Sequence, residues 1–213
     1  MNFVAHVALA ADRAPSEPEF ALGAALPDFA AMAGVRLGGA AGTIAAGVAH
    51  HRACDDVFHA HAWFTSRCYA LRDALFTAGV PRGPARACAH AGVELLLDGA
   101  LMTDARVRLQ VADVFARASS APSEVVAIAP ASDRDRWRAA LVRIATTLEP
   151  ARYVDPRFTA ERLHRMTARR PRLALSREHV DAVTVQLAAL RSDVTSSARE
   201  IVHDVRTRLG RVA

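Results

Sequence analysis

Two groups of histidine and acidic residues repeat with a spacing of four along the chain. The groups are His51, Asp55 and His59, followed by His90, Glu94 and Asp98. Because residues four apart share one face of an α-helix, each group is expected to form a stripe along its helix. Imidazole and carboxylate groups are metal ligands, and this mixture suits Mn²⁺, Fe²⁺, Zn²⁺ or Mg²⁺. The spacing therefore predicts a site for a divalent ion.

Helix geometry limits how one stripe can bind an ion. A helix rises about 1.5 Å per residue, so residues i and i+8 lie roughly 12 Å apart along its axis. The three members of a stripe therefore cannot all bind one ion. We expect adjacent pairs from the two helices to converge on a shared interior site, such as His51/Asp55 with Glu94/Asp98, or two ions to be held.

The second stripe has strongly apolar surroundings. Five aliphatic residues cover most of the perimeter of its helix: Val93, Leu95, Leu96, Leu97 and Leu101. A helix that is apolar nearly all round is buried, and a buried carboxylate must be paired, hydrogen-bonded or metal-bound. Glu94 and Asp98 therefore indicate a functional site or a buried polar network. For the first stripe, a solvated polar face is an equally good interpretation.

Arg52 and Asp28 are further candidates. Arg52 follows His51 and lies about 100° round the helix, so it is no ligand but could clamp a phosphate oxygen beside a metal. An ordinary surface arginine is an equal alternative. Asp28 follows Pro27, where the chain is expected to turn, and a turn or helix-cap role is the first interpretation.

The elements that position these residues are predicted to be helices. The chain has 213 residues, with 52% hydrophobic and only 6% aromatic residues, which favours closely packed helices over a sheet. The apolar periodicity and the Gly and Pro positions predict helices at about 2–12, 43–77, 85–102, 104–116, 133–147, 159–167 and 176–208. Glycines mark 34–42 as a connection. We predict one compact all-α domain over residues 1–213.

The charge of the chain suits an acidic partner. The net charge is +5, and all 27 basic residues are arginine, which binds carboxylates and phosphates bidentately. Such a surface fits a phosphoester, a nucleic acid or an acidic protein. Nucleic acid is the weakest of these, because aromatic residues are few and no recognition motif is present. No G-x-S-x-G motif of a serine hydrolase is present either.

The remaining features concern location and assembly. The three cysteines show no C-x-x-C pairing, which fits a reducing compartment. The N-terminal segment lacks the basic start of a signal peptide, and no apolar run is long enough to span a membrane. We therefore expect a cytoplasmic protein without membrane contact. The long C-terminal helix could either pack over the core or form a dimer interface, so the oligomeric state stays open.

Four segments resemble the acyl carrier protein phosphodiesterase family, in the same order as in the family. They are MNFVAHVALA at the start, GAALPDF, GVAHHRACDD and the later MTARRPRL. The similarity extends over nearly the whole chain. It implies a helical fold like that of HD phosphohydrolases, and hydrolysis of the phosphodiester that joins 4′-phosphopantetheine to a serine of acyl carrier protein. It also implies a divalent ion, typically Mn²⁺, and an acidic carrier protein as substrate.

The resemblance also implies roles for individual residues. Asp28 matches an aspartate of the N-terminal motif, and His51, Arg52 and Asp55 match the family's H-R-x-x-D. A divalent ion would activate water and polarise a phosphoryl oxygen there, while Arg52 would neutralise developing charge.

The chain departs from the family pattern in two places. His59 stands where the family tends to have a second aspartate, and the family's D-x-x-x-D-H becomes Glu94, Asp98 and Gly99. Either His90 replaces the lost imidazole, or the activity has drifted. One alternative is a phosphohydrolase of a small phosphoester, with a pocket opened by Gly99. Another is a metal-free binding protein that holds an acidic partner through Arg169, Arg170 and Arg172.

Overall fold

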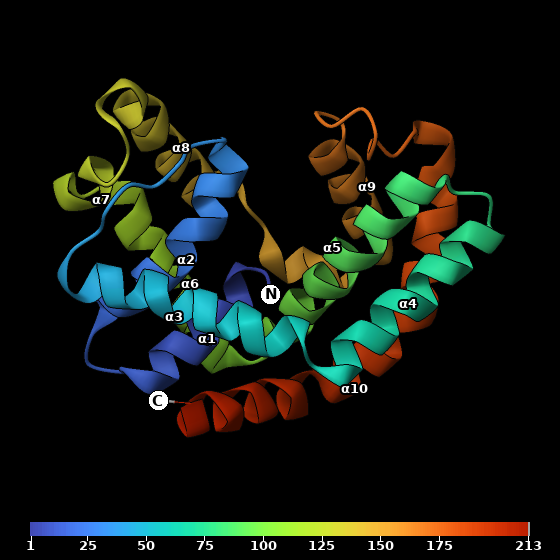
Figure 1. Cartoon of the computed structure of the whole chain (residues 1–213), viewed down its shortest axis with the longest axis horizontal. Helices are drawn as coiled ribbons and strands as arrows, with labels where there is room; N and C mark the ends of the chain where they lie inside the picture. The colour runs from blue at the N-terminus through green and yellow to red at the C-terminus, as the bar shows by residue number, and fades with distance from the viewer. Residues whose placement is uncertain (213) are drawn as a thin grey trace. The chain divides into compact units, whose positions relative to one another are not determined.

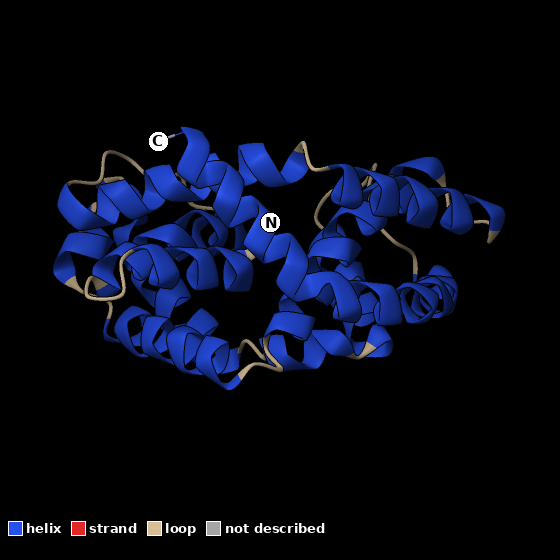
Figure 2. Cartoon of the chain, turned by 90° about the horizontal axis from the view of Figure 1, so that it is seen from below, coloured by secondary structure: helices blue, strands red, loops and turns tan. Residues whose placement is uncertain are grey.

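The computed structural model describes residues 1–212, and these form helices joined by loops, with no strand among them (Figures 1 and 2). The all-α fold class is therefore confirmed. The α-helices are α1 (Phe3–Arg13), α2 (Pro18–Ala33), α3 (Gly42–His59), α4 (Ala62–Thr77), α5 (Arg82–Leu101), α6 (Ala105–Ser120), α7 (Ser123–Ala127), α8 (Arg134–Thr147), α9 (Pro156–Thr167) and α10 (Val180–Val212). Three short 3₁₀ helices are η1 (Ala131–Asp133), η2 (Pro150–Val154) and η3 (Arg177–His179).

The chain folds into two compact units, each made of separate segments. Unit 1 contains Met1–Asp56, Asp104–Glu149 and the residues from Leu209 on, and unit 2 contains Val57–Thr103 and Pro150–Arg208. That the two units together make up one domain stays a prediction. No helix of the described chain is both long and apolar enough to span a bilayer.

In unit 1, α1 and α2 pack against each other and against α6, and α8 packs against α2 and α6. The rings of Phe3, Phe29 and Phe115 form one cluster at this junction, with centroids 5.5 to 6.3 Å apart. Trp137 of α8 is fully buried, and its indole N–H donates to the carbonyl of Val125 over 3.0 Å. This aromatic and aliphatic core holds α1, α2, α6 and α8 together.

The chain does not turn at Pro27. Pro27 lies inside α2, which continues to Ala33, so Asp28 is a mid-helix residue and the expected turn or cap role is wrong. A proline inside a helix removes one backbone hydrogen bond and crowds the carbonyl four residues earlier. Here burial of Leu26, Phe29 and Ala30 in the core of unit 1 offsets that cost.

The expected long helix over 43–77 is two helices, because α3 ends at His59 and α4 begins at Ala62. His61 has an extended backbone, and its side chain caps α4 by accepting from the backbone N–H of Trp63 at 3.2 Å. Histidine is not among the preferred N-cap residues, so the apolar periodicity alone did not predict this break.

In unit 2, α5 is the central helix and packs against α4, α9 and η2. It is buried along most of its second half, as its apolar sequence predicts. The ends of α5, α8 and α10 lie within a few residues of their expected positions, whereas α7 lies in a stretch for which no helix was predicted.

All three cysteines are free thiols, and Cys54 and Cys88 are buried. Burial raises the pKa of each of the three thiols to about 12. The nearby carboxylates of Asp55 and Glu94 contribute to this rise for Cys54 and Cys68, after burial.

Candidate functional site

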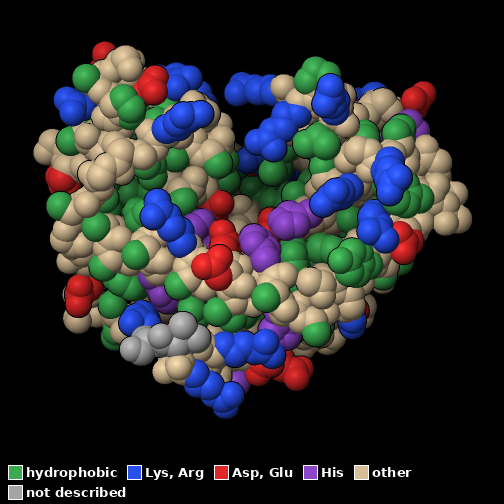
Figure 3. Space-filling model, viewed as in Figure 1, with side chains coloured by type: hydrophobic (Ala, Val, Ile, Leu, Met, Phe, Trp, Pro, Cys, Tyr) green, Lys and Arg blue, Asp and Glu red, His purple; other side chains and the backbone are tan. Residues whose placement is uncertain are grey.

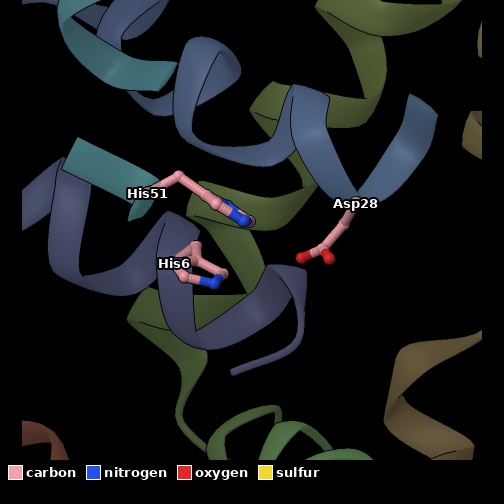
Figure 4. Close-up of side chains that lie close together, drawn as sticks. All are labelled: His6, Asp28 and His51. Carbon is pink, nitrogen blue, oxygen red and sulfur yellow. The ribbon is translucent and has the colours of Figure 1, made fainter. Parts of the chain in front are cut away.

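Three helices of unit 1 each direct one metal-ligand side chain into a common space: His6 from α1, Asp28 from α2 and His51 from α3 (Figure 4). One potential ligand atom of each residue lies within 4.8 Å of the other two. The two imidazole rings stack with centroids 3.7 Å apart, and both histidines are buried. Residues far apart in sequence are therefore brought together as one donor set, which we call the unit 1 cluster.

A close helix crossing sets the orientation of His51. A Cβ on Gly23 would lie 2.4 Å from the carbonyl oxygen of Ile44, and one on Gly47 would lie 2.2 Å from that of Phe20. The backbones of α2 and α3 therefore touch here. The crossing lets His51, one turn after Gly47, donate its Nδ1–H to the carbonyl of Ala24 over 2.8 Å. With Nδ1 donating to a carbonyl, the Nε2 of a neutral imidazole bears the lone pair.

Asp55 contacts both imidazoles. Its Oδ1 is 3.2 Å from Nε2 of His6 and 2.6 Å from the backbone nitrogen of Met1, and its Oδ2 is 3.4 Å from Nε2 of His51. Burial acts to raise the pKa of Asp55, but the contacts with His51, His6 and the Met1 amine outweigh burial and lower it. Asp55 therefore stays ionised. It orients the His6 ring through Nε2 and adds a negative charge beside the unit 1 cluster.

Burial lowers the pKa of His6 to about 3, so this imidazole is neutral at neutral pH, as a metal ligand must be. Burial also acts to lower the pKa of His51, but the contact with Asp55 and the charge of Asp28 raise it overall. The Nδ1 atom of His6 is buried and has no hydrogen-bond partner among residues 1–212. This unpartnered nitrogen could bind an ion. Two imidazoles and one carboxylate are a donor set that fits a divalent ion such as Mn²⁺, Fe²⁺ or Zn²⁺.

Arg52 directly follows His51 in the sequence, and its side chain is exposed on α3. No ion pair or hydrogen bond holds its guanidinium group within the described chain, so this charge is available to an anion. That placement fits the phosphate-clamp interpretation, which stays a prediction.

The residues of the second stripe, His90, Glu94 and Asp98, do not all meet at one point in the structure. In unit 2, His59, His90 and Glu94 bring their ligand atoms within 4.8 Å of one another, and we call them the unit 2 cluster. Asp98 is not a member. It is fully buried one turn further along α5 and acts on the ionisation of Tyr153, whose pKa is raised to about 12 mainly by burial. That the two stripes share one ion stays a prediction.

Gly99 lies where α5 touches the backbone of η2. A Cβ at this position would lie 2.3 Å from the nitrogen of Val154 and 2.5 Å from the carbonyl carbon of Tyr153. A side chain at position 99, such as the histidine that the resemblance implies there, would therefore have no room, and Gly99 opens no pocket at this contact. Glycine is required here by the close approach of two backbones.

We expect Gly99→Ala to destabilise the protein by about 3 kcal/mol, the upper part of the range for overpacking, because a clash with backbone cannot be relieved by a rotamer change. Thermal unfolding would measure the loss. Gly92→Ala on the same helix is the matched control. Its Cβ would meet side-chain methyl groups alone, the nearest that of Leu187 at 3.0 Å. Side chains can move where backbone cannot, so the loss should be smaller. Equal stability of Gly99→Ala and the unmodified protein would contradict the packing argument.

The sequence interpretation missed His6 as a site residue and left His59 doubtful. The available signal for His6 was an imidazole in the middle of an otherwise apolar helix, within the MNFVAHVALA segment. For His59, the i+4 spacing from Asp55 was visible, but its partners His90 and Glu94 come from α5. Only the fold shows which of these residues meet.

The fold and the unit 1 cluster together define a class: all-helical proteins that present histidine and aspartate side chains from several helices as one donor set. The model of the acyl carrier protein phosphodiesterase family matches residues 1–78, the segment that contains His6, Asp28, His51, Arg52 and Asp55. The resemblance to this family is thereby confirmed over that segment. For the rest of the chain, including MTARRPRL, it stays a prediction.

No curated protein and no solved structure matches the chain. The expected likeness to the fold of HD phosphohydrolases therefore also stays a prediction.

Proposed function

We propose that this protein is a metal-dependent phosphodiesterase that hydrolyses the bond between 4′-phosphopantetheine and a serine of acyl carrier protein, with Mn²⁺ as the preferred ion. The observation that supports this most directly is the unit 1 cluster. His6, Asp28 and His51 offer three ligand atoms within 4.8 Å of one another, inside the segment that matches the phosphodiesterase family.

The residues of the cluster have distinct tasks in this proposal. His6, Asp28 and His51 would hold the ion, which when bound supplies Lewis-acid polarisation of a phosphoryl oxygen and a lower pKa for water. Asp55 orients the His6 ring through Nε2, and the carbonyl of Ala24 orients the His51 ring through Nδ1. Arg52 pairs with a non-bridging phosphate oxygen and offsets the charge that develops in the transition state. Water adds to phosphorus, the serine oxygen leaves, and that oxygen takes up a proton.

The surface of the chain supports a carrier protein as substrate. Arginine side chains are spread over the face that Figure 3 shows, and the chain has a net charge of +5. Long-range attraction between such a surface and an acidic carrier protein speeds encounter. The small-phosphoester alternative relied on a pocket at Gly99, and the backbone contact there gives it no support.

The test is a hydrolysis assay on holo-acyl carrier protein with metal-stripped protein. We expect no release of 4′-phosphopantetheine after stripping, and recovery on addition of Mn²⁺, with the loss of the prosthetic group followed by mass spectrometry of the carrier protein. A panel of nucleotides and sugar phosphates is the comparison. Full activity of the stripped protein, faster hydrolysis of the panel, or binding of the carrier protein without turnover would each overturn the proposal.

A further inference from the structure

The unit 2 cluster is the second place where metal-ligand side chains meet, and it lies outside the site proposed above. His90 and Glu94 are one turn apart on α5, and His59 is the last residue of α3. Oε1 of Glu94 lies 3.0 Å from Nε2 of His59 and 3.2 Å from Nε2 of His90. Three donor atoms on two helices are thus already gathered around one point.

These separations suit a shared ion. Ligands about 2.1 Å from one tetrahedral ion lie roughly 3.4 Å from one another. The two Nε2···Oε1 separations need only a small expansion to reach that geometry. In the arrangement without an ion, Nε2 of each imidazole lies within hydrogen-bond distance of the carboxylate. A neutral imidazole that binds an ion through Nε2 carries its proton on Nδ1 instead.

Aromatic packing orients both imidazole rings. The Phe64 ring lies 5.3 Å from that of His59 and 5.2 Å from that of His90, the latter edge to face. Phe58, which is fully buried, packs on Phe64 with centroids 4.4 Å apart. Rings held in this way lose little freedom when they bind an ion.

The cluster keeps one negative charge in largely buried surroundings. The Glu94 side chain is only 13% exposed, and burial acts to raise its pKa. The hydrogen bonds from His59 and His90 outweigh burial, so the pKa of Glu94 is lowered overall and the carboxylate stays ionised. An ionised carboxylate between two imidazoles is a favourable environment for a cation.

Access to the cluster is open on the histidine side. The side chains of His59 and His90 are 37% and 51% exposed. An ion can therefore reach the site from solvent and keep positions for water or another ligand, unlike a closed structural site.

We propose that His59, His90 and Glu94 form a second metal site, which binds a divalent transition ion, with Zn²⁺ as the best fit, in preference to Mg²⁺. Two imidazoles and one carboxylate select zinc and its neighbours, whereas Mg²⁺ requires oxygen ligands. This inference does not rest on the proposed phosphodiesterase activity.

The experiment isolates this site by starting from the full-length His6→Ala/His51→Ala variant, in which the unit 1 cluster is removed. We expect this protein to bind one Zn²⁺ per chain by isothermal titration calorimetry, and Mg²⁺ far more weakly. Adding His90→Ala and Glu94→Gln should weaken Zn²⁺ binding by at least about 100-fold, since loss of an outer-shell partner alone costs 10- to 100-fold. Circular dichroism would verify that each variant is folded.

His203→Ala on α10 is the matched control, because His203 is exposed and outside both clusters. It should leave Zn²⁺ binding unchanged. Should the His6→Ala/His51→Ala background unfold, the same comparison in the unmodified chain would show two Zn²⁺ per chain falling to one. Zn²⁺ binding that is unaffected by His90→Ala and Glu94→Gln, or no stronger than Mg²⁺ binding, would overturn the proposal and leave the cluster as a hydrogen-bonded pair of histidines on a glutamate.

Discussion

Replacement of His51 by alanine is expected to abolish metal binding at the unit 1 cluster and to lower kcat/KM for holo-acyl carrier protein by about 10³-fold or more, the order seen when a key electrostatic group is removed. His51 is buried, is held by the carbonyl of Ala24 and directs its Nε2 toward the cluster. Metal analysis and the hydrolysis assay would be made on the same preparation, so that loss of ion and loss of rate are compared directly.

Arg52→Ala is the matched comparison, one residue further along α3. Its side chain is exposed and assigned to the phosphate, so this variant should retain the ion and lose rate. His51→Gln keeps most of the side-chain volume and controls for a cavity at a buried position. A folded His51→Ala protein with full metal content and full rate would contradict the assignment of His51 as a ligand.

Gly47→Ala is expected to destabilise the protein by about 3 kcal/mol, because its Cβ would lie 2.2 Å from a backbone oxygen of α2. In a chain of this length that loss lowers the melting temperature by about 6–12 °C. The variant should also lose activity beyond the loss of stability, since moving α3 away from α2 lengthens the hydrogen bond from His51 to Ala24. Differential scanning calorimetry and the hydrolysis assay at a temperature where the variant is folded would measure both effects.

The control for Gly47→Ala is Gly210→Ala, near the end of α10, where a Cβ would meet nothing within 4 Å. This change should cause no loss, and a gain of at most about 1 kcal/mol from helix propensity. A Gly47→Ala protein as stable as Gly210→Ala would show that α2 and α3 are free to separate.

Much of the fold follows from periodicity. The helices at α1, α5, α8 and α10 were predicted because each has an apolar stripe or a fully apolar face. The errors arise where tertiary contacts decide the backbone. Pro27 predicts an end to α2, but the buried residues on both sides keep the helix intact. His61 starts a new helix through one side-chain hydrogen bond, which has no signature in the apolar pattern.

The site was predicted less completely, for a geometric reason. Spacing along one helix shows that His51 and Asp55 share a face, but the partners of His51 are on other helices. His6 and Asp28 join it because α1, α2 and α3 pack in unit 1, and no local pattern gives that packing. In the same way His59, and not Asp98, meets His90 and Glu94.

The high pKa of the cysteines has a practical consequence at the bench. A thiol with a pKa of about 12 is almost entirely protonated at neutral pH, and the protonated form reacts slowly with oxidants and alkylating agents and is a poor metal ligand. The protein can therefore be purified and titrated without dithiothreitol, which itself binds zinc. Neither cluster of metal-ligand side chains in the described part of the chain contains a cysteine, so zinc bound at either cluster would be held by imidazole and carboxylate groups.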